Sequence, residues 1–167
     1  MLSSLKIRLY GDPVLRKKSS PVQEVGPSER ILIQSMIATM HHYKGIGLAA
    51  PQVGINQEII VVDIGDGPMT MINPAILEKE GKIFLEEGCL SIPEVTVNVK
   101  RSKEIKVQYL NVNGKNIKKT FKDLFARVIL HEVDHLKGKL IIDYASKEEK
   151  EKFKDKLEEI EKESSKL

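Results

Sequence analysis

The chain has 167 residues, which is enough for one domain with its own hydrophobic core. Apolar residues make up 41% and charged residues 31%, a composition typical of a globular protein and too apolar for a disordered one. The net charge of +3 comes without a block of basic residues, and Trp is absent, so neither DNA nor RNA is expected as a main binding partner.

The single cysteine, Cys89, excludes an intrachain disulfide. Residues 1–6 lack the apolar stretch of a secretory signal, and apolar runs such as residues 59–62 are far shorter than the roughly 20 residues that cross a bilayer. We therefore predict a cytoplasmic protein without a membrane segment, in a reducing compartment where a lone thiol persists.

The first predicted element is a helix over residues 28–44, after an extended lead-in. Ser28 is its predicted N-cap, apolar residues follow at helical spacing, and Gly45 is predicted to take the left-handed conformation at its end. Strand-like segments come next, over residues 58–63, 69–77, 82–86 and 95–99.

A β-hairpin is the clearest predicted element in the middle of the chain. Apolar and polar residues alternate over residues 105–109 and again over 117–121, and Asn113-Gly114 between them is typical of a tight turn. Thr120 and Asp123 then match a capping box, which predicts a second helix over residues 121–137.

The composition changes near the C-terminus. Residues 146–167 are almost all Lys and Glu with one narrow apolar stripe, which predicts a charged helix that lies on the same domain, residues 1–145, through that stripe. We therefore predict an α+β fold of mostly antiparallel strands around one central buried helix, with an N-terminal and a C-terminal helix.

The strongest functional signal is His131-Glu132-Val133-Asp134-His135 in the second predicted helix. Positions i and i+4 share one face of a helix, so both imidazoles can bind one metal ion, and the glutamate between them can act as a general base. The apolar residues around this motif predict a buried helix, in which unpaired histidine and glutamate would be costly. A metal ion would explain why they are there.

A catalytic metal needs a third protein ligand. Two known peptidase patterns fail, because Ile141 stands where one would place a histidine and Lys154 where the other would place a glutamate. Cys89 is a candidate, since a thiolate is a strong ligand for a borderline metal, and acidic residues elsewhere stay open. His41 and His42 are also candidates, although cations at the end of a helix explain them better.

The segment 45–54, with the sequence GIGLAAPQVG, is the third candidate. Its glycine spacing matches a dinucleotide-binding fingerprint, but it follows a helix instead of a strand, and Pro51 would interrupt the helix that the fingerprint requires. We predict a closely packed loop or strand whose backbone lies against a ligand, with Gln52 as an amide donor. A surface amide is the alternative for Gln52.

Three segments together resemble the motifs of the peptide deformylase family, in the family's order and spacing: residues 45–52, the Glu-Gly-Cys-Leu-Ser segment 87–91, and residues 131–135. The resemblance covers most of the chain up to Tyr144. Two departures are Leu130, where the family commonly has glutamine before the helix motif, and Arg127, where other members carry an aliphatic residue or an arginine. Neither departure removes a candidate ligand or the acid/base.

The resemblance implies that residues 1–145 are the catalytic domain and that Cys89, His131 and His135 hold a divalent metal ion. A catalytic water would take the fourth position. The resemblance implies Fe(II) as the native ion, with Zn(II), Ni(II) or Co(II) in purified protein.

The implied reaction removes the formyl group from the N-terminal formylmethionine of newly synthesised polypeptides and releases formate. Glu132 would transfer the proton of the water to the departing amine, and the Gln52 amide and the backbone N–H of Leu90 would hold the oxyanion. The resemblance also suggests that Glu87 supports the site through Arg101. The implied substrate-binding residues are Ile46, Gly47, Leu90, Leu124, Arg127 and Val128, although core packing explains Leu124 and Val128 equally well.

The implied partners are formylmethionyl nascent peptides, and the protein is expected to be a monomer. Because a C-terminal helix binds the ribosome in some bacterial members, ribosome contact through residues 146–167 is a further expectation, but seven lysines against eight acids there give it no electrostatic support. Two rival interpretations are a peptidase with an unidentified acidic third ligand, and a non-catalytic protein with a closed structural metal site.

Overall fold

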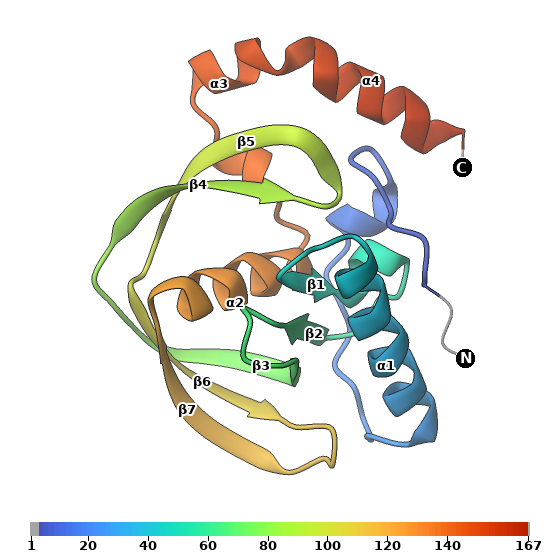
Figure 1. Ribbon diagram of the computed structural model, residues 1–167, viewed down its shortest axis with the longest axis vertical. Coiled ribbons are helices and arrows are strands. Elements are labelled where there is room, and N and C mark those ends of the chain that lie inside the picture. Colours follow the sequence, from blue (N-terminus) through green and yellow to red (C-terminus); the bar gives the residue numbers. More distant parts are fainter. Residues whose placement is uncertain (1–3, 167) are drawn as a thin grey trace.

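The structure, a computed structural model, describes residues 4–166 and confirms the predicted α+β class (Figure 1). Residues 1–3, the first half of the segment searched for a secretory signal, and the last residue of the predicted C-terminal helix lie outside this range. No helix within residues 4–166 combines the length and apolar character needed to cross a membrane. The elements in chain order are η1 (Pro13–Arg16), α1 (Pro27–His42), β1 (Gly47–Ala49), η2 (Ala50–Val53), β2 (Ile59–Val62), β3 (Met69–Glu80), β4 (Ile83–Cys89), β5 (Ile92–Arg101), β6 (Glu104–Leu110), β7 (Asn116–Lys122), α2 (Asp123–Leu136), η3 (Ile141–Tyr144), α3 (Lys147–Lys152) and α4 (Lys154–Ser165).

Two separate antiparallel sheets enclose the helix α2. Strands β1-β2-β3-β6-β7 form the larger sheet in that order, and β4 pairs with β5 in a two-stranded ribbon. Figure 1 shows this ribbon arching over one side of α2 while the larger sheet lies on the other side. Apolar side chains of α2 are buried around most of the helix, as predicted for a central helix.

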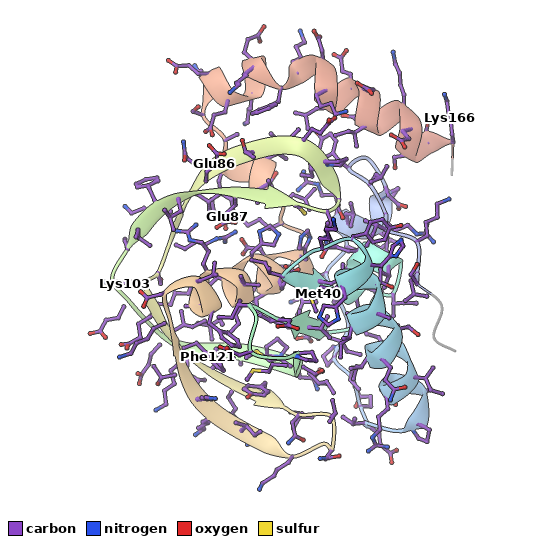
Figure 2. All side chains as sticks on the ribbon, viewed as in Figure 1. Met40, Glu86, Glu87, Lys103, Phe121 and Lys166 are labelled. Carbon is purple, nitrogen blue, oxygen red and sulfur yellow. The ribbon has the colours of Figure 1, made fainter. Side chains whose placement is uncertain are left out.

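Strand β2 is buried along its whole length because helices cover both faces of the larger sheet. Ile60 lies in the apolar cluster with α2, and the next residue, Val61, lies in the cluster with α1, since successive side chains of a strand point to opposite faces. Phe121 and Met40, labelled in Figure 2, belong to these two clusters respectively. The sheet therefore holds α2 in a fixed position from one side.

The N-terminal helix is present, but both of its predicted ends are wrong. It begins at Pro27 with Gly26 as N-cap, and the Glu29 carboxylate accepts from the Gly26 N–H at 2.8 Å. At the other end, Lys44 takes the left-handed conformation with φ 57. Gly45 packs closely instead: a Cβ there would lie 2.8 Å from Leu90 Cδ1, so a larger residue would require the Leu90 side chain to shift.

The predicted capping box before the second helix does not form, because the hairpin continues past it. Thr120 pairs with Lys106 in the β6–β7 ladder, which runs on to Lys122. Helix α2 consequently begins at Asp123, with no side-chain cap. Strands β3, β4 and β5 are also longer than predicted, since β4 and β5 pair as far as Cys89 and Ile92.

The charged C-terminal segment forms two helices where one was predicted. Ser146 caps α3 by accepting from the Glu149 N–H, and the chain leaves helical geometry at Phe153 before α4 begins. Leu157 and Ile160 on α4 are buried in an apolar cluster that includes residues of β5. The apolar stripe thus lies against the ribbon, on the side away from α2 (Figure 1).

Candidate active site

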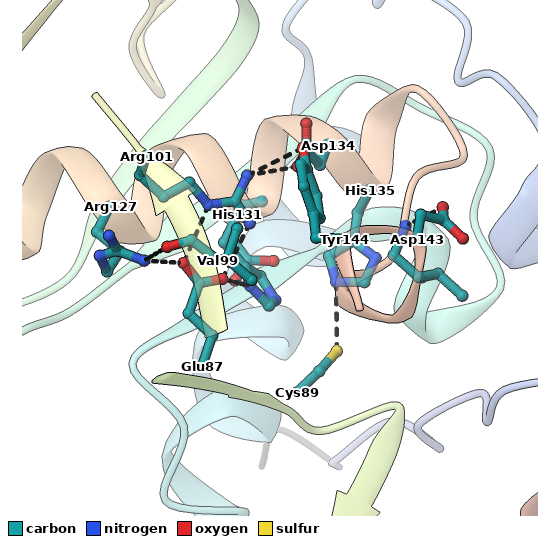
Figure 3. Close-up of polar contacts among 12 residues, drawn as sticks. Glu87, Cys89, Val99, Arg101, Arg127, His131, Asp134, His135, Asp143 and Tyr144 are labelled. Atoms are coloured by element: carbon teal, nitrogen blue, oxygen red, sulfur yellow. Dashed lines mark hydrogen bonds and ion pairs between the residues drawn. The ribbon is translucent and has the colours of Figure 1, made fainter. Parts of the chain in front are cut away.

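Strand β4 supplies two of the side chains that face α2. Because strand residues alternate, Glu86 is exposed while Glu87 is buried, and Figure 2 labels both at the ribbon. The pairing of β4 with β5 is irregular between Glu87 and Cys89, and β4 ends at Cys89. The thiol of Cys89 lies there opposite the histidines of α2 (Figure 3).

Cys89, His131 and His135 converge on one point. Cys89 Sγ lies 3.4 Å from His135 Nε2, and one donor atom from each of the three residues lies within 4.8 Å of the others. With metal–sulfur and metal–nitrogen bonds of about 2.3 and 2.0–2.1 Å, a tetrahedral site has a sulfur–nitrogen edge of roughly 3.6 Å. The donor types and their spacing therefore fit one divalent metal ion.

Hydrogen bonding and burial prepare both histidines to act as ligands. His131 Nδ1 lies 2.9 Å from Glu87 Oε1, and because a carboxylate only accepts, Nδ1 carries a proton and Nε2 is the nitrogen left for a metal ion. Burial alone would lower the pKa of His131, but the charge of Glu132 and the hydrogen bond with Glu87 raise it well above its usual value, so a metal ion at Nε2 would replace a proton. Burial holds the pKa of His135 well below its usual value, so this imidazole is neutral at pH 7. Both rings can therefore present a nitrogen to a metal ion, that of His131 after Nε2 gives up its proton.

Glu87 is a buried carboxylate held by three cationic or polar side chains. Arg101 donates to both of its oxygens, Oε2 at 3.0 Å and Oε1 at 2.9 Å, and Arg127 donates to Oε2 (Figure 3). Burial by itself would raise the pKa of Glu87, but the hydrogen bonds from His131 and Arg101 outweigh it and lower the pKa to about 2. Glu87 is therefore ionised at physiological pH, and its suggested contact with Arg101 is present.

Glu132 projects into the same region from α2. Burial raises its pKa to about 7, and its Oε1 has no hydrogen-bond partner among residues 4–166. Its Oε2 lies 3.9 Å from His131 Nε2. A buried carboxylate with a free oxygen beside the donor cluster is placed to exchange a proton with a molecule in the cavity.

The Gln52 amide is fully buried, so the alternative of a surface amide is wrong. Its Oε1 accepts from the Ala49 N–H at 2.9 Å, which fixes which way the amide points. Its Nε2 lies 3.1 Å from Ser91 Oγ and 3.6 Å from Cys89 Sγ. The amide N–H groups are thus directed toward the cluster of donors.

One cavity of about 870 Å³ joins these residues. His135 is almost completely buried and is not among the lining residues, whereas His41 pairs with Asp63 at 2.8 Å and is not among the converging donors. The predicted residues that line the cavity are Ile46, Gly47, Gln52, Cys89, Leu90, Leu124, Arg127, Val128, His131 and Glu132.

Sequence reasoning missed part of the polar network. Asp134 accepts from Arg101 at 2.5 Å and from the Tyr144 hydroxyl at 2.6 Å, and Ser91 bonds the catalytic candidate Gln52. The sequence contained one usable signal for this network. Arg127 precedes His131 by four residues, so the two side chains lie on the same face of the helix.

The α+β fold and this cavity define a class of protein: hydrolases whose buried helix carries two histidines and a glutamate opposite a cysteine. Comparison with known proteins makes the assignment specific. Residues 4–151 match the family model described as polypeptide deformylase. The peptide deformylase of Thermotoga maritima is 48% identical over 156 residues, which cover 93% of this chain and 95% of that protein.

Solved structures with similar folds belong to the same family. The crystal structure of the Thermotoga maritima peptide deformylase has a TM-score of 0.85 and 50% identity, and covers 86% of this chain and 99% of its own. A peptide deformylase from Legionella pneumophila has a TM-score of 0.90 at 33% identity, covering 99% of both chains. The chain belongs to the polypeptide deformylase family, and it is an enzyme of that family, whose activity is the removal of N-formyl groups from nascent peptides.

Proposed function

We propose that this protein is a metal-dependent hydrolase that removes the formyl group from the N-terminal formylmethionine of newly synthesised polypeptides and releases formate. The observation that carries this proposal is the convergence of Cys89 Sγ with the imidazoles of His131 and His135 in a cavity that also holds the Glu132 carboxylate. The protein would work as a cytoplasmic monomer, with residues 1–145 as its catalytic domain.

In this proposal Cys89, His131 and His135 hold the metal, with Fe(II) as the native ion and Zn(II), Ni(II) or Co(II) as substitutes. When bound with an open position, such an ion lowers the pKa of water and polarises a carbonyl group. The thiolate supplies the soft donor and the two imidazoles supply neutral donors, a set that suits these ions. The role of Glu87 is to orient the His131 ring through its Nδ1.

Glu132 is the proposed general base and acid. Its carboxylate, which lines the cavity, accepts a proton from a water molecule there, and the same carboxyl group then gives the proton to the departing amine. Burial limits the access of bulk water to this carboxylate.

Gln52 and Leu90 are the proposed donors to the oxyanion that develops on the formyl oxygen. The Gln52 Nε2 is directed by the bond that its Oε1 accepts from Ala49. The Leu90 N–H lies in the backbone directly after Cys89. Removal of one such donor from an oxyanion hole typically costs about 2.7–4 kcal/mol of transition-state stabilisation.

The methionine side chain would occupy the apolar part of the cavity. Ile46 and Leu124 at the rim are about half exposed, and Val128 and Leu90 lie deeper. Gly47 in β1 offers its backbone to the peptide. Ribosome contact through α3 and α4 extends the proposal, and the exposed charged side chains of these helices are available for it.

The decisive experiment measures formate release from formyl-Met-Ala-Ser by the metal-loaded protein and by its Glu132→Gln variant. We expect the variant to keep its metal and to lose at least about 100-fold in kcat, because general acid–base catalysis typically contributes that much. Glu78→Gln, an exposed glutamate on β3, is the matched control and should retain full activity. Undiminished turnover by Glu132→Gln would contradict the mechanism.

A further inference from the structure

The side chain of Arg127 makes unusual contacts for a residue that lines a substrate cavity. It is only 5% exposed. Its Nη1 donates to Glu87 Oε2 and, at 3.0 Å, to the carbonyl of Val99, and its Nη2 donates at 2.7 Å to the carbonyl of Ile83. One guanidinium thus binds a carboxylate and the backbone of both β4 and β5.

Arg127 also shares an acceptor with a candidate metal ligand. It lies one helical turn before His131, and the two side chains bind different oxygens of Glu87, Arg127 at Oε2 and His131 at Oε1 (Figure 3). Arg101 bridges both oxygens from the other side. A rotation of the Glu87 carboxylate that released the imidazole would therefore also disturb its bond to Arg127.

The arrangement of the strands makes this contact important. Strand β4 carries Cys89, and within residues 4–166 it pairs only with β5, so no backbone ladder described there joins it to the larger sheet that supports α2. The buried ion pairs and the bonds from Arg127 to the carbonyls of Ile83 and Val99 are accordingly polar connections between the ribbon with the cysteine and the helix with the histidines. Arg101 and Arg127 also balance the charges of Glu87 and Asp134, so loss of one arginine leaves a buried carboxylate undercompensated.

We propose that Arg127 is a positioning residue that holds the Glu87 carboxylate against His131 and fixes the end of β4 relative to α2, and that it does not act as a contact for the substrate. This inference rests on the proposed metal site. Its consequence is that Arg127 sets the affinity of the site for metal through Glu87, to which its side chain donates.

The test compares Co(II) affinity, measured on the metal-free protein in competition with a chelator, with kcat and KM for formyl-Met-Ala-Ser. Arg127→Met should weaken Co(II) binding by about 10- to 100-fold, the typical effect of losing a partner that orients a ligand. Arg127→Lys should bind Co(II) more weakly than the wild type as well, because an ammonium cannot satisfy three acceptors in the plane of a guanidinium.

Arg30→Met is the matched control. Arg30 also donates to two backbone carbonyls, those of Val112 and Val25, but it lies outside the cavity. This variant should lose stability and keep the Co(II) affinity and turnover of the wild type. Equal losses of Co(II) affinity in Arg127→Met and Arg30→Met would overturn the inference.

A raised KM in Arg127→Met with unchanged Co(II) affinity would also overturn it, because that result identifies a substrate contact. If Arg127→Met does not fold, Arg127→Lys decides the question by the same affinity measurement, with unchanged affinity as the contradicting result. Absence of formate release by the wild-type protein would refute the proposed function, whereas the Co(II) comparison would still decide the role of Arg127.

Discussion

At the scale of single residues, the cavity depends on a side chain that is absent. A Cβ on Gly47 would lie 2.5 Å from Glu132 Oε2 and 2.7 Å from Val128 Cγ1, distances that real Cβ atoms do not adopt. The glycine therefore makes room for the Glu132 carboxylate in its present position. This steric requirement is separate from any backbone contact between Gly47 and a peptide.

Gly47→Ala is expected to displace Glu132 and to lower kcat by about 100-fold, because a shift of about 1 Å in a catalytic group can cost that much. The metal content should stay unchanged, since the new methyl group meets Glu132 and Val128 and none of the three donors. Parallel kinetics and metal analysis check both expectations. Gly26→Ala, at the N-cap of α1 far from the cavity, is the control that should keep the wild-type kcat; wild-type kcat in Gly47→Ala would refute the steric argument.

At the scale of elements, a charged contact joins the N-terminal η1 to η3 near the other end of the chain. Arg16 donates to both carboxylate oxygens of Asp143, at 2.7 and 3.1 Å, and Asp143 also accepts from the Leu140 N–H at 3.0 Å. Burial by itself would raise the pKa of Asp143, but these bonds together lower it below its usual value. The two short helices are thereby held together in a pH-dependent way.

Because the folded-state pKa of Asp143 lies below the unfolded one, its stabilisation is fully present above about pH 4 and is lost as the pH falls through the folded-state pKa. Asp143→Asn should lower the free energy of unfolding by about 0.2–1 kcal/mol at pH 7, the range for partly exposed ion pairs. Urea unfolding at several pH values should show this difference shrinking below pH 4. Asp66→Asn, at an exposed position, is the control. If the difference in the free energy of unfolding between the wild type and Asp143→Asn stayed the same at low pH, the ion pair would not be its cause.

At the scale of the whole molecule, the candidate metal site connects two parts that share no sheet. Cys89 comes from the β4–β5 ribbon, and His131 and His135 come from α2, which packs against the larger sheet. A ligand that binds only the folded protein adds stability according to its concentration and Kd. Metal binding should therefore stabilise the whole fold and hold the ribbon in place.

Removal of the metal with a chelator is expected to lower the free energy of unfolding, by about 2.7 kcal/mol compared with protein at a free metal concentration of 100 times Kd. Amide hydrogens of β4 and β5 should exchange faster in the metal-free protein, because the ribbon then loses one of its connections to α2. Urea unfolding and hydrogen exchange measure the two effects. In Cys89→Ala both effects should be much smaller; a urea midpoint that is the same with and without metal would exclude the coupling.

Several expectations from the sequence failed at the ends of elements. Thr120 matched a capping box, but pairing with Lys106 in the hairpin kept it in a strand. Phe153 lay in a continuous helical pattern, but it is partly buried against an apolar cluster and the chain leaves helical geometry there. In both cases contacts with distant residues outweighed a local preference. Sequence patterns report only the local preference, so they misplace such ends.

The sequence by itself determined the α+β class and the helix that presents His131, Glu132 and His135 on one side, because strand alternation and helical spacing are local properties of the chain. Only the tertiary structure decided that Cys89 meets the histidines, that Gln52 is buried beside them, and that Arg127 binds Glu87, a residue 40 positions away. These contacts depend on how the β4–β5 ribbon folds over α2. No spacing in the chain records that arrangement, because it results from packing between segments far apart in the sequence.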